Sequence, residues 1–108
     1  MKKKIKSNPI YVVSTVRVYN SEYGERSDSR AVGWFETFKD AEEIVIGNYG
    51  DIEEAGYYTY AVIEKVEPGL YRFDLDAVWY KFRGRKKITA KRIKCPKKFK
   101  SLVGFGIG

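Results

Sequence analysis

The chain of 108 residues carries 21 Lys or Arg and 14 Asp or Glu, a net charge of +7, and contains no histidine. Hydrophobic residues make up 44% of it and aromatic residues 16%, which excludes a disordered protein, and the length fits one domain with one core. One cysteine, Cys95, excludes an internal disulfide and a cysteine-based zinc site. Without histidine the chain lacks the commonest general base and metal ligand, so we expect no enzyme, no metal and no cofactor.

Charge is polarised along the chain. Residues 1–6 carry four Lys, residues 7–76 carry six basic against all fourteen acidic side chains, and residues 77–108 carry eleven basic side chains and no acid. Such polarity is typical of proteins with anionic partners. The alternative is that opposite charges neutralise one another within the fold.

No stretch approaches the roughly 18 apolar residues that span a membrane. The basic start followed by an apolar stretch lacks the small-residue cleavage site of a signal peptide, so we expect a cytoplasmic protein without a membrane partner. Residues 1–8 are expected to form a flexible basic tail of a single domain, 1–108.

The N-terminal half predicts a hairpin and a helix. Alternating β-branched residues predict a first strand over 9–19, the polar cluster 20–29 predicts a flexible loop, and 30–35 is the returning strand. Thr37 is placed to cap a helix that Gly47 or Gly50 should end. Strand composition returns in "YYTYAVIEKV", residues 57–66, before a turn at "EPGL".

The C-terminal half predicts a second hairpin, with a tight turn around Gly84 between "AVWYKFR" and "KITAKRI". Pro96 is placed to begin a second helix, "PKKFKSLV". The expected fold is therefore α+β, with a mainly antiparallel sheet of about five strands and two helices in the order β-β-α-β-β-β-α.

The C-terminal hairpin suggests one candidate surface for binding an anion. Trp79, Lys81 and Arg83 should share one strand face, and Lys87, Thr89 and Lys91 should lie opposite, which gives a basic plate carrying one indole. Lys and Arg neutralise phosphates and aromatic rings stack on bases. Alternatively, Trp79 belongs to the core and the lysines keep an edge strand soluble.

A second candidate cluster contains Trp34, Tyr49 and the pair Tyr57–Tyr58, near the ends of elements where pockets form. The alternative is that Trp34, Phe35 and Phe38 pack the helix on the sheet. Because adjacent strand residues point to opposite faces, one of Tyr57 and Tyr58 should be exposed.

Several stretches, "GWFETFKDAEE", "NYGDI", "YYTYAVIE", "WYKF" and the final "VGFGIG", resemble a group of small uncharacterised proteins of bacteriophages and mobile elements in Gram-positive bacteria. The resemblance covers residues 10–82 and the last six. It implies a phage-encoded protein, and small phage proteins without catalytic residues are often inhibitors of host defence. Relatives are mixed in charge or acidic after "WYKF", so the basic 83–100 is a local specialisation.

Three functional hypotheses follow. In the first, the protein is a non-catalytic anti-defence protein that sequesters an anionic nucleotide-type ligand, with candidate contacts Trp34, Tyr58, Trp79, Arg83 and Lys87. In the second, it binds a nucleic acid or nucleoprotein, for example as an inhibitor of a host CRISPR-type nuclease, through Arg85, Lys86, Lys91 and Arg92. In the third, it is a protein–protein adaptor or homo-oligomer in which the acidic 40–54 region meets the basic tail of another copy.

Overall fold

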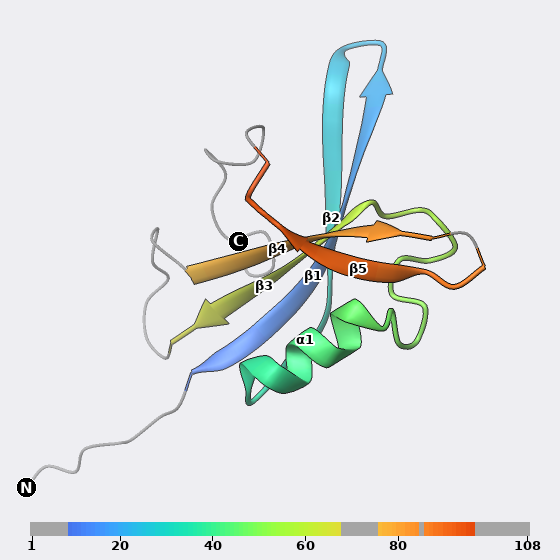
Figure 1. The fold of residues 1–108 in the computed structure, drawn as a ribbon. Helices are drawn as coiled ribbons and strands as arrows, with labels where there is room; N and C mark the ends of the chain where they lie inside the picture. Colours follow the sequence, from blue (N-terminus) through green and yellow to red (C-terminus); the bar gives the residue numbers. More distant parts are fainter. Residues whose placement is uncertain (1–8, 68–75, 85, 97–108) are drawn as a thin grey trace, which may run out of the picture.

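The computed structural model describes residues 9–67, 76–84 and 86–96 as one sheet with a helix on one face (Figure 1). Five antiparallel strands lie in the order β2-β1-β3-β4-β5. The elements are β1 (Ile10–Ser21), β2 (Gly24–Phe35), α1 (Phe38–Ile46), β3 (Tyr60–Val66), β4 (Asp76–Arg83) and β5 (Thr89–Ile93). The expected α+β class and the five-stranded antiparallel sheet are confirmed.

The described residues contain one helix, α1, placed in the chain as expected. The expected second helix begins at Pro96 and otherwise lies outside the described residues, as does the basic tail 1–8. No helix in the described ranges is long and apolar enough to cross a membrane.

Helix α1 begins and ends at the residues that the sequence indicated. The hydroxyl of Thr37 accepts a hydrogen bond of 3.1 Å from the backbone N–H of Asp40, and Gly47 follows the last helical residue. Ala41 and Val45, one helical turn apart, are completely buried against the sheet. They join a core cluster with residues of β1, β3, β4 and β5, namely Val13, Ala61, Ile63, Tyr80, Phe82 and Ala90.

A second apolar cluster lies on the opposite face of the sheet. Val16, Val62 and Trp79 form its buried centre, and partly buried residues, among them Val18, Tyr60, Ile93 and Cys95, pack against it. The central strands are therefore buried on both faces, which explains the continuous buried run from Val12 to Val16 in β1.

The expected flexible loop over 20–29 is wrong. Only Glu22 and Tyr23 form the turn between β1 and β2. β1 pairs with β3 only as far as Val16, so beyond that residue β1 and β2 stand out of the sheet as a two-stranded ribbon, at the top of Figure 1. Residues 24–30 are all exposed. Their polar sequence resembles a loop because a strand with no buried face has no need of apolar residues.

Candidate anion-binding site

The hairpin formed by β4 and β5 positions the first candidate surface. Lys81 lies opposite Lys91 and Arg83 lies opposite Thr89. Tyr80, Phe82 and Ala90 pack on the α1 side of the sheet, so the alternating residues Lys81, Arg83 and Lys91 point to the other side. The shared face expected for Lys81, Arg83, Thr89 and Lys91 is confirmed, whereas Lys87 lies in the turn, outside the paired residues.

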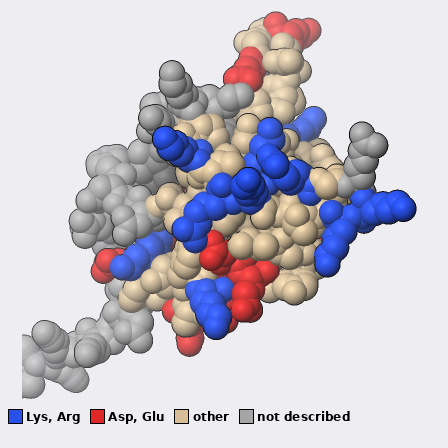
Figure 2. Space-filling model, viewed as in Figure 1, with Lys and Arg blue, Asp and Glu red and all other residues tan. Residues whose placement is uncertain are grey.

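Exposed cations follow this hairpin along both strands and around its turn. We call this set the basic edge: Lys81, Arg83, Lys86, Lys87, Lys91 and Lys94. No Asp or Glu occurs between residues 77 and 96, and no ion pair joins the basic edge to a carboxylate of the described residues. Figure 2 shows Lys and Arg side chains in a band over β5, with Asp and Glu below them over α1. Arg85, the remaining cation of the turn, lies outside the described residues.

Lys81 and Lys91 are directly opposite on neighbouring strands, and like charges in that position destabilise a sheet. Edge protection by lysine explains Lys91, because β5 is an edge strand. It does not explain Lys81, because β4 lies between β3 and β5. An anion bound across the two strands would relieve this repulsion.

Arg92 lies on the other face of β5 and is neutralised within the fold. Its guanidinium and the hydroxyl of Tyr80 both donate to the carboxylate of Glu42, the latter over 2.6 Å. Burial acts to raise the pKa of Glu42, but the hydrogen bonds from Tyr80 and Arg92 outweigh it and lower that pKa. Burial, followed by the hydrogen bond to Glu42, raises the pKa of Tyr80. Arg92 therefore already has a carboxylate partner within the protein, and its expected contact with a nucleic acid stays a prediction.

The two tryptophans do not belong to one site. Trp79 is 5% exposed and packs in the second apolar cluster, which corrects its expected role as an indole on the basic plate. Trp34 is 59% exposed on β2, and β1 and β3 separate it from β4. At about 4.8 Å per strand, three strand intervals place β2 and β4 about 14 Å apart. Trp34 is thus neither core nor a neighbour of the basic edge.

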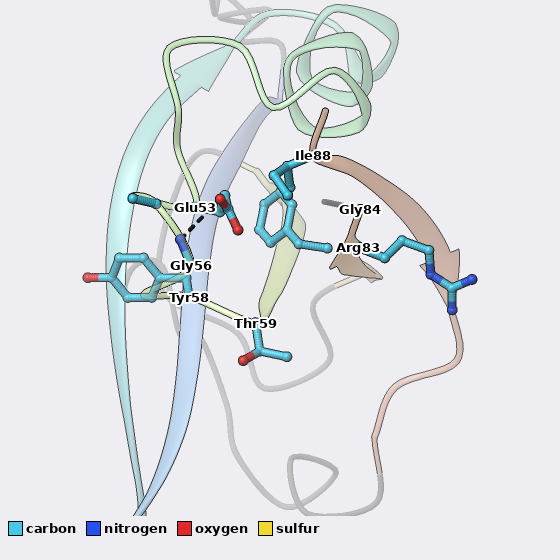
Figure 3. Close-up of a pocket in the computed structure, with 9 residues that line it drawn as sticks. Glu53, Gly56, Tyr58, Thr59, Arg83, Gly84 and Ile88 are labelled. Atoms are coloured by element: carbon cyan, nitrogen blue, oxygen red, sulfur yellow. Dashed lines mark hydrogen bonds between the residues drawn. The ribbon is translucent and has the colours of Figure 1, made fainter. Parts of the chain in front are cut away.

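A cavity of about 430 Å³ lies between the loop after α1 and the end of the β4–β5 hairpin, and both Tyr58 and Arg83 line it. Figure 3 shows the carboxylate of Glu53 at this cavity, accepting a 3.1 Å hydrogen bond from the backbone N–H of Gly56. In the same view the side chains of Tyr58 and Arg83 point in opposite directions. The cavity is lined by Glu53, Ala55, Gly56, Tyr58, Thr59, Phe82, Arg83, Gly84 and Ile88.

One of the two adjacent tyrosines is exposed, as expected, but it is Tyr57 at 43%, whereas the candidate Tyr58 is 7% exposed. The sequence did not indicate what holds Tyr57. The Arg17 guanidinium lies 4.4 Å from the centre of the Tyr57 ring and 4.6 Å from that of Tyr19. This contact joins the base of the ribbon to the loop after α1, and no local pattern reports such a long-range contact.

Comparison with protein-family models, with curated proteins and with solved structures found no match. Within the described ranges, no group of three or more Cys, Asp or Glu residues is placed to hold a metal ion. The basic edge is consequently the feature from which a function is inferred.

Proposed function

We propose that this protein is a non-catalytic nucleic-acid binder that holds a phosphate backbone along the basic edge. The observation that supports this proposal is the exposed Lys81–Lys91 pair, whose mutual repulsion no carboxylate of the described residues relieves. Phosphate contacts dominate the affinity of nucleic-acid binding, and they need cations without base-reading geometry. The absence of histidine from the sequence agrees with a binding function.

The extent of the basic edge favours a polymer over a single nucleotide. The five residues of β5 span about 17 Å at ~3.4 Å per residue, which is the length of about five nucleotides of one strand. The cations also continue around the turn through Lys86 and Lys87 and along β4 through Arg83 and Lys81. A partner with regularly spaced charges contacts more of them than a small anion does.

Capture of a nucleotide-type ligand has narrower support and stays a prediction. In its favour, Tyr58 and Arg83 line a cavity whose volume of about 430 Å³ suits a small ligand. Against it, the buried carboxylate of Glu53 lines the same cavity and would repel an anion. Trp34 and Trp79 contribute nothing to that cavity.

The resemblance to phage proteins fits an inhibitor that occupies a nucleic-acid channel or covers a nucleic acid that a host nuclease needs. A cytoplasmic location, where both partners occur, also stays a prediction.

Fluorescence anisotropy with labelled single-stranded and duplex DNA tests the proposal. We expect binding that weakens steeply between about 50 and 200 mM salt, because each neutralised phosphate releases counterions. The double variant Lys81→Glu/Lys91→Glu should weaken it at least about tenfold, since two attractive contacts become repulsive. Neither side chain belongs to an apolar cluster, so we expect the fold to be retained.

A matched control is Lys39→Glu/Lys65→Glu, which changes the net charge equally but lies on α1 and β3. We expect this control to retain most of the affinity. Equal losses in the two double variants, or an affinity that does not change with salt, would contradict the basic edge as the binding surface.

A further inference from the structure

We propose that a second copy of this chain pairs with the outer edge of β2, along residues 24–30 of the ribbon, to form a weak homodimer. The outer edge of β2 is the opposite edge of the sheet from the basic edge, so such a dimer is separate from nucleic-acid binding.

Alternate residues of β2 direct their backbone N–H and C=O groups away from β1. The carbonyl of Val16 accepts a 3.0 Å hydrogen bond from Thr59, so the backbone of Val16 faces β3. Strand backbones alternate, so the neighbouring Arg17 faces β2 and forms a hydrogen-bonded pair with Asp28. It follows that Ser27 and Ser29, on either side of Asp28, direct their N–H and C=O groups away from β1.

The outer edge of β2 is exposed along residues 24–30. In the part of the chain that the structure describes, no strand pairs with β2 except β1. Sheet proteins usually block a long edge with proline, a bulge or charged side chains, lysine above all. The segment 24–30, "GERSDSR", contains neither proline nor lysine, its two acidic and two basic side chains balance, and the β-bulge at Val32 comes only after it. An exposed, regular edge of this length is a template for another strand.

The charge pattern of β2 favours a second copy of the chain as the partner strand. Pairing must be antiparallel about a two-fold axis, with outward-facing residues opposite one another. With Ser27 at the axis, Arg26 of each copy lies opposite Asp28 of the other. These are non-hydrogen-bonded positions, where side chains are closest. Moving the axis by one residue in either direction instead places Arg26 opposite Arg26 or Asp28 opposite Asp28.

A register centred on Ser29 would also bring opposite charges together, by placing Asp28 against Arg30. Arg30 is already ion-paired with Glu54 of the loop after α1. That register also runs into the bulge at Val32. The register centred on Ser27 avoids both conflicts.

The ribbon does not suit the partner proposed for the basic edge. Residues 17–30 contain three Arg and three acidic side chains, which cancel in net charge. One of these cations, Arg17, stacks on Tyr19 and Tyr57. A polyanion would gain little here, whereas a strand of identical sequence satisfies both signs.

The size of the interface sets its strength. Seven paired residues a side cover less than the roughly 1,200–2,000 Å² of a stable protein interface, so we expect a dimer that forms at high concentration. Since β2 and β5 are opposite edges of the sheet, this dimer would carry one basic edge at each end.

Sedimentation velocity over about 1 µM to 1 mM protein tests the proposal, because that range spans weak association. We expect the wild-type protein to shift from the mass of one copy toward two. Ser27→Pro should remain monomeric, since proline removes the outward N–H at the axis while leaving the pairing with β1 intact. The control Ser27→Ala keeps that N–H and should dimerise like the wild type.

A charge swap tests the register and does not depend on proline. Asp28→Arg places two arginines opposite each other across the axis and should abolish dimerisation. Arg26→Asp/Asp28→Arg restores the opposite charges in the register centred on Ser27 but not in that centred on Ser29, so it should recover the dimer. A wild-type protein that is monomeric throughout, a dimer unaffected by Ser27→Pro, or a double variant that fails to recover it would overturn the proposal.

Discussion

The two edges of the sheet differ in the way their charges are arranged. The basic edge on β4 and β5 carries six exposed cations and no acid, and two of its lysines face each other. The outer edge of β2 alternates in sign, with Arg26 and Asp28 on the same face. Both edges belong to one antiparallel sheet, so the difference between them lies in their side chains and not in the type of strand pairing.

The two proposals, nucleic-acid binding and dimerisation, rest on this difference in charge. A row of like charges cannot pair with itself and requires a partner of the opposite sign, whereas an edge of alternating sign is complementary to its own copy. A similar difference exists across the thickness of β5. On one face, Lys91 forms no ion pair with a carboxylate of the described residues. On the other face, Arg92 is ion-paired with Glu42.

The largest expected effect separates the two edges. The quadruple variant Lys81→Glu/Lys86→Glu/Lys87→Glu/Lys91→Glu should lose nucleic-acid affinity by on the order of a thousandfold, because it reverses four of six contacts. It should dimerise as the wild-type protein does, since none of these residues lies on β2. Anisotropy and sedimentation of the same samples measure both properties. Loss of dimerisation together with binding would show that the edges are not independent.

The turns of the two hairpins provide the next comparison. Gly84 has a φ of +126°, and a Cβ built on it would lie 2.2 Å from the carbonyl oxygen of Lys87. Gly24 has a φ of +106°, with nothing within 4 Å of such a Cβ. Gly84→Ala should therefore lower the free energy of unfolding by about 3 kcal/mol, through backbone strain and a clash, and Gly24→Ala by about 1 kcal/mol.

Urea denaturation of the two alanine variants measures this difference. The ribbon turn is the matched control, because it carries the same strain without the clash. Equal losses of stability would mean that the β4–β5 turn is not held as closely as the structure shows.

The smallest expected effect concerns the neutralised face of β5. Tyr80→Phe removes the 2.6 Å hydrogen bond to Glu42 and should lower the free energy of unfolding by about 2 kcal/mol, as for other bonds to charged groups. The pKa of Tyr80 is raised above its ordinary value of 10.0, so its contribution is complete below pH 10.0 and is lost as the pH rises further.

The wild-type protein should consequently lose stability above about pH 10 by more than Tyr80→Phe does, measured by urea denaturation across that range. Equal alkaline losses in both proteins would contradict the position of the Tyr80 hydroxyl. At the acidic end the lowered pKa of Glu42 predicts the opposite sign: stability present above pH 4.5 falls as that carboxylate is protonated.

Local sequence patterns predicted much of the fold. Thr37 and Gly47 marked the ends of α1 because caps satisfy backbone groups within a few residues of one another. The alternation around Lys81 and Arg83 gave the correct face because side-chain direction in a strand has a period of two. The ribbon was mistaken for a loop because its residues, exposed on both faces, carry no hydrophobic pattern.

The sequence by itself determined that many basic side chains lie on the β4–β5 hairpin, since their number and spacing along the chain are local properties. Only the tertiary structure decided which of them remain available. Arg92 meets Glu42, fifty residues away along the chain, and Trp79 enters a core built from β1 and β3. Burial and ion pairing depend on residues distant in sequence, so composition predicted an anionic partner, whereas packing decided which cations stay exposed along one surface.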